Sequence, residues 1–451
     1  MTDTAAKTQQ QVSDKDVRKA VGAAAMGNAL EWFDFGVYGY LAVEIGRVFF
    51  PSGSLTQSLL WTFATFALGF LIRPLGGFFF GPLGDKIGRN RVLATTIILM
   101  SGATFAIGLL PSYAAMGLWA PAGLIILRLI QGFSTGGEYG GAATFMVEYA
   151  SDKKRGFLSS WLEFGTLAGY AASGILVAVI TALVTSEQML DWGWRIPFLM
   201  AGPLGIVGLY LRLKLEDSPV FRKLEEAGQV SKSPLRDTFV NHWRQMLICV
   251  GLVVILNVAY YTVLKYMPTY LKAELGIADL QALILSLSIL FGMMLLVTFV
   301  GRYSDKVGRK PVLYAACIGF ILLAIPAFYL MIHGTTVLTF VGLGILGFLV
   351  VLLAGTMPAT LPAIFPTHVR YGGFAISYNT STSLFGGTAP LVITWLISLT
   401  NSNYIPAYYL MAAAVVSLIA LGSLKETARQ PLASPRIGSK PREETGLEAG
   451  D

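Results

Sequence analysis

Long apolar stretches separated by short polar segments run along most of the chain. Twelve of them come close to the ~20 apolar residues that one helical crossing of a bilayer needs. Six lie in the first half of the chain, at about 20–48, 58–83, 91–111, 116–146, 157–184 and 195–213. Six more lie at about 244–271, 281–300, 311–332, 336–362, 373–399 and 405–424. The pattern predicts an all-α membrane protein with twelve transmembrane helices.

The composition supports a membrane protein and disfavours other classes. Apolar residues make up 54% of the chain and charged residues 13%, about half the share of charge in a soluble protein. The net charge of +7 does not indicate nucleic-acid binding, because the basic residues lie in short loops between the apolar stretches. The histidines lack metal-ligand spacing, and no GxxxxGKS or GxxxxGKT phosphate loop is present. We therefore expect no enzyme activity, no metal and no other cofactor.

One long polar segment, dense in Lys, Arg, Glu and Asp, divides the apolar stretches into two sets of six. The expected organisation is an N-terminal tail at 1–19, a six-helix half at 20–213, a linker at 214–243, a second six-helix half at 244–424 and a C-terminal tail at 425–451. The first residues lack the apolar core of a signal peptide, so they are expected to form a tail. The sequence leaves the oligomeric state open.

The short loops differ in positive charge. Lys and Arg are concentrated in the loops after the second, fourth and eighth spans, whereas the loops near Ser112 and Asn401 carry none. Because loops rich in Lys and Arg stay on the cytoplasmic side, we expect both termini and the linker to be cytoplasmic. The expected location is the bacterial inner membrane.

The two halves repeat one loop. GPLGDKIGRN (81–90) recurs as GRYSDKVGRK (301–310), each between the second and third span of its half. Membrane topology explains the basic residues but not the Asp, the glycines or the duplication. We therefore expect a cytoplasmic latch, in which the loop pairs with a neighbouring helix end and glycines permit tight turns and close helix approach. Its candidate residues are Gly81, Asp85, Lys86, Gly88 and Arg89, and in the second copy Gly301, Asp305, Lys306, Gly308 and Arg309.

This repeated loop resembles the signature of the major facilitator superfamily. Within it, GNALEWFDFGVYGYLA (27–42), QGFSTGGEYGGA (131–142) and DWGWRIPF (191–198) resemble the metabolite:proton symporter family, which includes importers of proline and betaine, 2-oxoglutarate, citrate and shikimate. TLPAIFPTHVRY (360–371) and KETARQPL (425–432) resemble its proline/betaine branch in particular. The resemblance implies symport of a proton with a zwitterionic osmolyte such as proline or glycine betaine. A di- or tricarboxylate such as 2-oxoglutarate or citrate is the alternative.

Carboxylates inside the spans are candidates for proton coupling. Glu31 and Asp34 lie three residues apart in the first span, so they share one helical face. A carboxylate in hydrocarbon must face a cavity, form a pair or take up a proton. We expect Asp34 first and Glu31 second to couple the proton, with Glu138 and Glu163 as further candidates. An ion pair with Arg73 or Arg128 is the alternative, and it is compatible with coupling.

Buried cations and rings are candidates for binding the solute. Arg128, in the fourth span, has the planar fork that suits a carboxylate, whereas Arg73 before Pro74 is a second cation that could instead fix helix geometry. Ring faces could hold an ammonium group, although most rings in a membrane protein serve packing. The further candidates are Trp32, Tyr38, Trp161, Tyr260, Tyr261 and Tyr378 for ring contacts, and Asn257 and Asn379 for hydrogen bonds.

Lys265, in the seventh span, has two interpretations. It could be a second cation for a dianionic solute, which would favour dicarboxylates. It could instead extend to the outer interface, because only about six residues separate it from the helix end. We prefer the interpretation that Lys265 extends to the interface.

Overall fold

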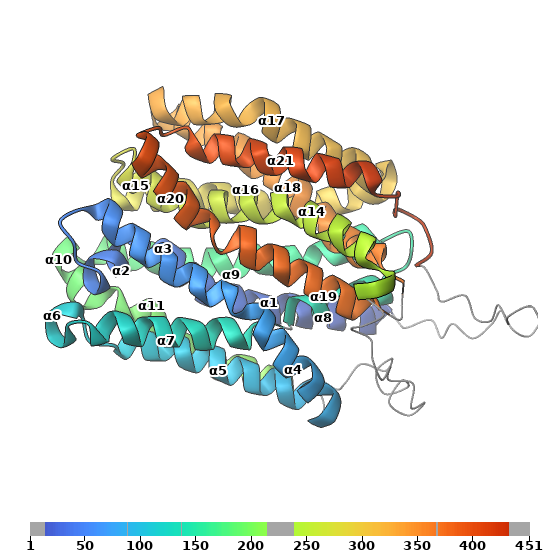
Figure 1. Ribbon diagram of the computed structural model, residues 1–451, viewed down its shortest axis with the longest axis horizontal. Coiled ribbons are helices and arrows are strands. Elements are labelled where there is room, and N and C mark those ends of the chain that lie inside the picture. Colours follow the sequence, from blue (N-terminus) through green and yellow to red (C-terminus); the bar gives the residue numbers. More distant parts are fainter. Residues whose placement is uncertain (1–13, 88, 137, 214–238, 367–368, 433–451) are drawn as a thin grey trace, which may run out of the picture.

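The computed structural model describes residues 14–87, 89–136, 138–213, 239–366 and 369–432. In this part of the chain every regular element is a helix. Figure 1 shows the helices running side by side along the longest axis of the molecule. The described elements of the first half are α1 (Asp14–Tyr40), α2 (Ala42–Phe49), α3 (Leu55–Leu71), α4 (Arg73–Ile87), α5 (Arg89–Leu109), α6 (Tyr113–Met116), α7 (Trp119–Ser134), α8 (Glu138–Tyr149), α9 (Arg155–Leu183), α10 (Ser186–Gln188), the π-helical η1 (Met189–Gly193) and α11 (Arg195–Leu213).

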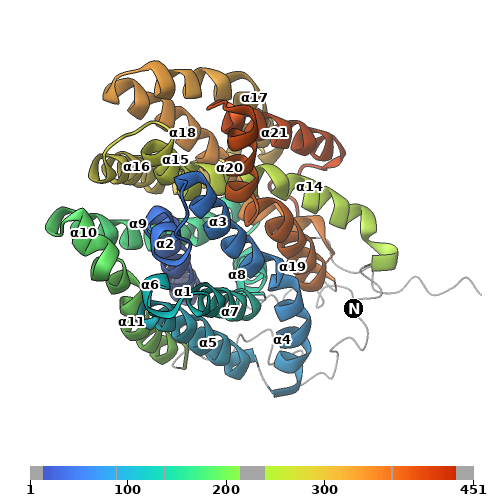
Figure 2. The same ribbon diagram turned by 60° about the vertical axis from the view of Figure 1, so that its left-hand side comes forward.

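The second half is built in the same way, with two π-helical turns inside its spans. Its described elements are α14 (Trp243–Tyr260), the π-turn η2 (Tyr261–Tyr266), α15 (Met267–Ala273), α16 (Asp279–Val307), α17 (Arg309–His333), α18 (Thr336–Thr360), the 3₁₀ turn η3 (Pro362–Ile364), α19 (Arg370–Ser381), the π-turn η4 (Thr382–Gly386), α20 (Ala389–Thr400) and α21 (Ile405–Ser423). Figure 2 shows the two halves packed against each other, with α3, α8 and α9 of the first half near elements of the second.

The element order is consistent with the twelve expected spans. Among the described residues, eight helical stretches are long and apolar enough to cross a bilayer, and two shorter apolar helices cover 94–109 and 195–210. The remaining two spans are interrupted: the first between α1 and α2, and the fourth between α7 and α8. Both carry buried charged residues, which lower their hydropathy. The expected linker falls largely on 214–238, which lies outside the described residues.

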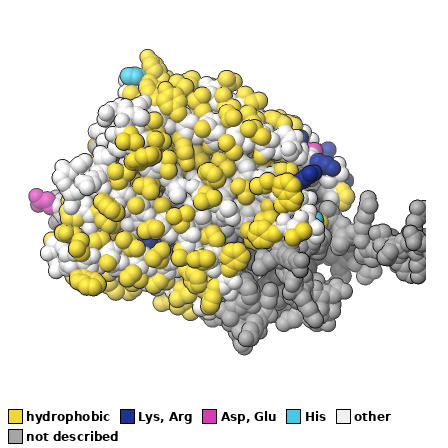
Figure 3. All heavy atoms as spheres, in the orientation of Figure 1, with side chains coloured by type: hydrophobic (Ala, Val, Ile, Leu, Met, Phe, Trp, Pro, Cys, Tyr) yellow, Lys and Arg dark blue, Asp and Glu magenta, His cyan; other side chains and the backbone are white. Residues whose placement is uncertain are grey.

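The surface fits a lipid environment. Figure 3 shows hydrophobic side chains over the middle of the visible face, whereas charged side chains gather toward the ends of the bundle. Exposed large apolar side chains are spread over both halves, including Phe79, Ile206, Leu295 and Ile419. Lipid contact explains this exposure, since an aqueous surface would leave these groups in water.

Small residues bring α1 close to α9. A Cβ added to Gly165 would lie 2.2 Å from the carbonyl oxygen of Ala25, and one added to Gly169 would lie 1.9 Å from that of Ala29. Only glycine permits this spacing, which is typical of helices packed in membranes. The close approach holds α1, with its two carboxylates, at the centre of the bundle.

Candidate functional site

Five charged side chains meet between the halves. Glu31 and Asp34 come from α1, Arg73 from α4 and Arg128 from α7, while Lys265 comes from η2 of the second half. All five are at least 95% buried. Charges at this depth persist only when they form pairs or line an enclosed polar site, so we take this cluster as the candidate site.

Glu31 forms an ion pair with Arg73. The Nη2 atom of Arg73 lies 3.3 Å from Oε1 of Glu31 and also donates to the carbonyl oxygen of Thr135, at 3.4 Å. The ring of Phe70 lies 5.0 Å from the Arg73 guanidinium. The ion-pair alternative therefore holds for Glu31, and Arg73 also ties α4 to the end of α7.

Asp34 is connected to Arg128 through two neutral side chains. Thr104 Oγ1 lies 3.1 Å from Oδ2 of Asp34, Gln131 donates to Thr104 at 2.5 Å, and Arg128 Nη1 donates to Gln131 at 2.8 Å. The Thr104 hydroxyl also lies 2.9 Å from the carbonyl oxygen of Met100. It has one proton, which it can donate to an ionised Asp34 or, when Asp34 is protonated and donates to it, to Met100. The network accommodates both protonation states by rotating one hydroxyl.

Arg128 keeps one edge of its guanidinium without a hydrogen-bond partner among the described residues. Nη1 is held by Gln131, whereas Nε and Nη2 are buried and unpartnered. The guanidinium lies 4.0 Å from the ring centroid of Tyr38 and 4.9 Å from that of Phe66. The Tyr38 hydroxyl donates to the carbonyl oxygen of Thr62 at 2.9 Å, which fixes this ring. Nε and Nη2 form the edge that binds a carboxylate with two parallel hydrogen bonds.

Lys265 does not extend to the outer interface, so the preferred interpretation is wrong. The residue is 2% exposed, and its ammonium lies among aromatic rings inside the bundle. Tyr261 and Lys265 lie four residues apart in the π-turn η2, and both are buried, with the Lys265 ammonium against the rings of Tyr261 and, from α1, Trp32. The number of residues between Lys265 and the helix end does not by itself indicate whether the side chain points to the interface or into the bundle.

Glu163 lies where the halves meet. Its Oε1 accepts a hydrogen bond from Tyr139 of α8, and its Oε2 accepts one from Tyr260 of α14, both at 2.6 Å. Tyr139 stacks on Tyr378 of α19, with ring centroids 4.3 Å apart. A carboxylate of the first half thus binds a hydroxyl of the second, beside stacked rings from both halves.

The other predicted residues are placed differently. Asn257 donates to Thr382 within the second half at 3.2 Å, and Asn379 donates to the carbonyl oxygen of Gly136 at the break in the fourth span, at 2.8 Å. Trp161 makes its ring contacts with Phe157 and Phe164 of its own helix, so the structure does not bring it to the charged cluster. The side chain of Glu138 lies outside the described part of the structure.

Several residues of the site were not predicted. They are polar or aromatic groups that connect the predicted ones, namely Phe66, Phe70, Thr104, Gln131 and Tyr139. One signal was available for Gln131: it follows Arg128 by three residues and so shares its helical face. Thr104 carries no such signal, because its partners lie on other helices.

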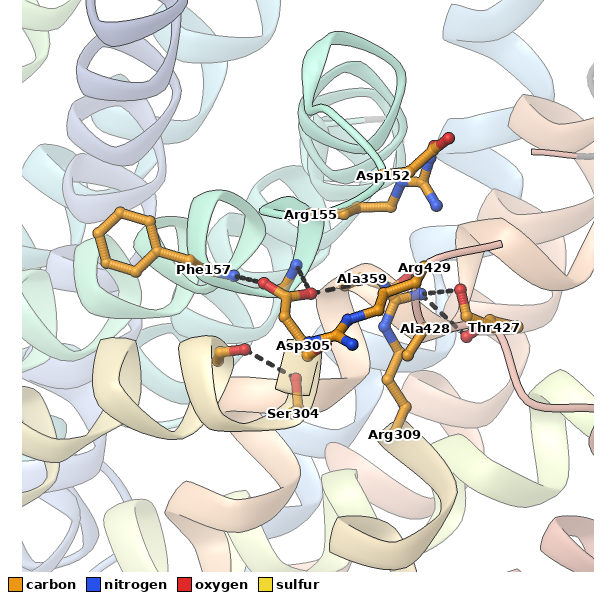
Figure 4. A network of polar contacts seen from close by, with 12 residues as sticks. Asp152, Arg155, Phe157, Ser304, Asp305, Arg309, Ala359, Thr427, Ala428 and Arg429 are labelled. Atoms are coloured by element: carbon orange, nitrogen blue, oxygen red, sulfur yellow. Dashed lines mark hydrogen bonds and ion pairs between the residues drawn. The ribbon is translucent and has the colours of Figure 1, made fainter. Parts of the chain in front are cut away.

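The second copy of the repeated loop joins the two halves at one end of the bundle, here called the latch end (Figure 4). Asp305 accepts hydrogen bonds from the backbone N–H groups of Gly156 and Phe157, at 2.7 and 2.9 Å. These groups open α9, where helix N–H donors lack partners of their own. A Cβ on Gly156 would lie 2.5 Å from the carbonyl oxygen of Gly301, so glycines permit this approach.

The remaining latch candidates divide into described and undescribed residues. Gly308 has φ +108°, a conformation that favours glycine, at the turn between α16 and α17. Arg309 is buried and donates to the carbonyl oxygen of Ala359 at 2.9 Å, while Lys306 is exposed. In the first copy, Gly88 lies outside the described residues. The structure describes the backbone but not the side-chain surroundings of the other four candidates, Gly81, Asp85, Lys86 and Arg89.

The segment after α21 packs onto the latch end. Glu426 accepts hydrogen bonds from the backbone N–H groups of Arg309 and Lys310, both at 3.0 Å. Arg429 donates to the carbonyl oxygen of Asp305 at 2.8 Å, and Arg155 donates to that of Gln430 at 3.0 Å. Partial burial raises the pKa of Glu426, but hydrogen bonds from four backbone N–H groups outweigh it and lower the pKa below its usual range.

Glu426→Gln should lower the melting temperature of the purified protein at pH 7, because Gln loses the negative charge at the start of α17. The free energy of unfolding should fall by about 1 kcal/mol. Since the pKa of Glu426 is lowered in the folded state, its contribution is complete above the usual Glu pKa of about 4.3 and disappears as the pH falls through the lowered value. Glu187→Gln, at an exposed position of α10, is the matched control. A difference that persists unchanged in acid would contradict the prediction.

Comparison with known proteins decides the family. Residues 24–388 match the family described as the Major Facilitator Superfamily. The chain belongs to the Major Facilitator Superfamily. It is 46% identical to the proline/betaine transporter of Salmonella typhimurium, over 93% of this chain and 86% of the relative. It is 45% identical, with the same coverage, to the glycine betaine/proline/ectoine/pipecolic acid transporter OusA of Dickeya dadantii and to the proline/betaine transporter of Escherichia coli.

Solved structures show the same fold. The proton:xylose symporter XylE bound to 6-bromo-6-deoxy-D-glucose has a TM-score of 0.74 at 18% identity, and covers 93% of this chain and 98% of its own. A crystal structure of a D-xylose-proton symporter has a TM-score of 0.69 at 20% identity, covering 91% of this chain and 99% of its own. The all-helical facilitator fold and the resemblance to proline/betaine transporters are both confirmed. This facilitator is a multi-pass membrane protein.

Proposed function

We propose that this facilitator imports a zwitterionic osmolyte, such as proline or glycine betaine, together with a proton. The names of the 45–46% identical relatives support the solute class. The proposed setting is the bacterial inner membrane, with the latch end and both termini in the cytoplasm, as the basic loops favour. The partners are then the solute, the proton and the lipid bilayer.

The unpartnered edge of Arg128 carries the proposal. Two buried nitrogen donors that lack hydrogen-bond partners among the described residues are unfavourable, and a solute carboxylate would satisfy both. Gln131 and the Tyr38 ring hold the guanidinium, so the edge is oriented before the solute arrives. Arg73 is a weaker candidate because Glu31 already neutralises it.

Asp34 is the proposed proton site because it is linked to Arg128. A proton on Asp34 removes a negative charge from the network of Thr104 and Gln131, which leaves the positive charge of Arg128 less compensated. Proton and solute carboxylate therefore favour each other's binding by the same factor. Such reciprocal coupling is what symport requires.

Alternating access requires contacts between the halves that form and break. At the latch end Asp305 binds the start of α9, and Arg370 of α19 pairs with Glu148 of α8 at 2.9 Å. At the opposite end Lys272 of α15 pairs with Glu44 of α2 at 3.5 Å. With contacts at both ends, the site is enclosed between the halves, as expected between outward and inward opening.

Tyr260→Phe should weaken the contact between the halves, because it removes the hydroxyl that reaches Glu163 from the second half. A hydrogen bond to a charged group contributes about 1.5–3 kcal/mol, so the melting temperature should fall. Tyr139→Phe is the matched control, since it removes the same kind of bond within the first half. We expect only Tyr260→Phe to change the rate of solute exchange; equal effects of both variants would contradict a role between the halves.

A di- or tricarboxylate is the second candidate solute, and Lys265 favours it. The cluster holds three cationic side chains, Arg73, Arg128 and Lys265, against two carboxylates, Glu31 and Asp34. An additional cation suits a solute with more than one negative charge.

Uptake into proteoliposomes tests the proposal. Radiolabelled proline, glycine betaine, 2-oxoglutarate and citrate are compared with and without an imposed pH gradient. We expect accumulation of proline, betaine or both, dependent on the gradient. Accumulation of 2-oxoglutarate or citrate alone would support the second candidate, and uptake indifferent to the gradient would contradict proton coupling.

A further inference from the structure

The ammonium of Lys265 occupies an aromatic enclosure. Its Nζ lies 4.4 Å from the ring centroid of Tyr261 and 4.7 Å from those of Trp32 and Phe35. The rings of Phe66 and Phe70 follow at 5.0 and 5.3 Å. Faces of aromatic rings within about 6 Å attract a cation, and several together form the kind of cage that binds quaternary ammonium groups.

The enclosure is closed around this side chain. Its rings come from α1, α3 and η2, so both halves contribute to it. Lys265 is 2% exposed, and Nζ has no hydrogen-bond partner among the described residues. The backbone of α1 also passes nearby, because a Cβ added to Gly39 would lie 3.7 Å from the Lys265 Cβ. Ring faces are therefore the immediate surroundings of the ammonium.

A cation already in the cage affects which solutes fit. A second positive group placed on the same rings would be repelled by Lys265 at short range in a poorly screened interior. A quaternary ammonium has no N–H groups, so ring faces are its main source of attraction. A secondary ammonium such as that of proline can instead donate hydrogen bonds to a carboxyl oxygen, and Asp34 and Glu31 lie in the same cluster. Asp34 keeps an oxygen that accepts a hydrogen bond even when it is protonated.

We propose that Lys265 determines selectivity among zwitterionic solutes, favouring those whose ammonium carries N–H groups over quaternary ones. The inference rests on the proposed function, in which Arg128 holds the solute carboxylate. Lys265 supplies the positive charge that the cage would otherwise take from the solute. A solute of the proline type leaves Lys265 in place, whereas glycine betaine must displace it.

The test compares proline and glycine betaine uptake by the full chain in the same proteoliposomes under one pH gradient. Wild type should take up proline in preference to betaine. Lys265→Met keeps the length of the side chain and removes its charge, so the ratio of betaine to proline uptake should rise about tenfold, corresponding to ~1.4 kcal/mol. Lys265→Arg keeps the cation and should keep the preference for proline. Lys265→Gln is a second neutral variant, for use if Lys265→Met does not yield folded protein.

The outcomes separate the inference from the proposed function. Equal uptake of both solutes by wild type, or an unchanged ratio in Lys265→Met and Lys265→Gln, would overturn the inference and leave the proposed function standing. A betaine preference in Lys265→Arg would also overturn it, because the charge would then be irrelevant. Accumulation of 2-oxoglutarate with neither zwitterion taken up would overturn the proposed function, and the inference with it.

Discussion

We expect Asp34→Asn to abolish accumulation of the solute against its gradient, while exchange of solute across the membrane persists. Asparagine matches the size of aspartate and can still accept a hydrogen bond from Thr104, but it cannot bind a proton. With one proton per solute, a gradient of two pH units stores about 2.7 kcal/mol, enough for roughly 100-fold accumulation. In proteoliposomes driven by such a gradient, accumulation by the variant should therefore be roughly 100-fold lower than accumulation by wild type.

The experiment on Asp34 needs a control for the amide itself. Asp191→Asn makes the same chemical change at an exposed position of η1 and should accumulate solute as wild type does. Counterflow, in which labelled solute enters vesicles loaded with unlabelled solute, needs no proton gradient and should survive in Asp34→Asn. Full accumulation by Asp34→Asn would exclude this residue as the proton site and would make Glu163 the next candidate.

Arg128→Lys should raise the KM for proline by about 10–150-fold. Lysine keeps the positive charge but offers a single ammonium in place of the planar edge formed by Nε and Nη2. The loss of one hydrogen bond to a charged partner is worth about 1.5–3 kcal/mol, which gives this range. The kinetics of proline uptake under a fixed pH gradient provide the measurement.

A carboxylate-specific readout separates binding from a structural role. Prolinamide has the ring and ammonium of proline but no carboxylate, so wild type should discriminate strongly between the two in competition for uptake. Arg128→Lys should narrow this discrimination, whereas Arg47→Lys, at an exposed position of α2, should leave it unchanged. Equal losses for proline and prolinamide would mean that Arg128 only supports the fold.

The sequence alone determined the fold and the set of charged residues. Each span must satisfy its own backbone hydrogen bonds in lipid and therefore carries its apolar signature locally, without reference to its neighbours. The repeated loop is local too, so the relation of the halves could be read from 81–90 and 301–310. A charged residue within an apolar span is conspicuous because it is costly there, which is why Glu31, Asp34, Arg128 and Lys265 were all singled out.

Only the tertiary structure decided which of these residues meet and in what role. Glu31 and Asp34 share one helical face, yet Glu31 pairs with Arg73, 42 positions away, and Asp34 accepts from Thr104, 70 positions away. Spacing within a helix fixes direction but not the partner that a neighbouring helix presents. Lys265 is a second example: the rings that enclose its ammonium come largely from α1 and α3, which the local sequence around Lys265 does not contain. A charged residue in a membrane span can therefore be identified from the sequence of that span alone, whereas its partners depend on how the helices pack.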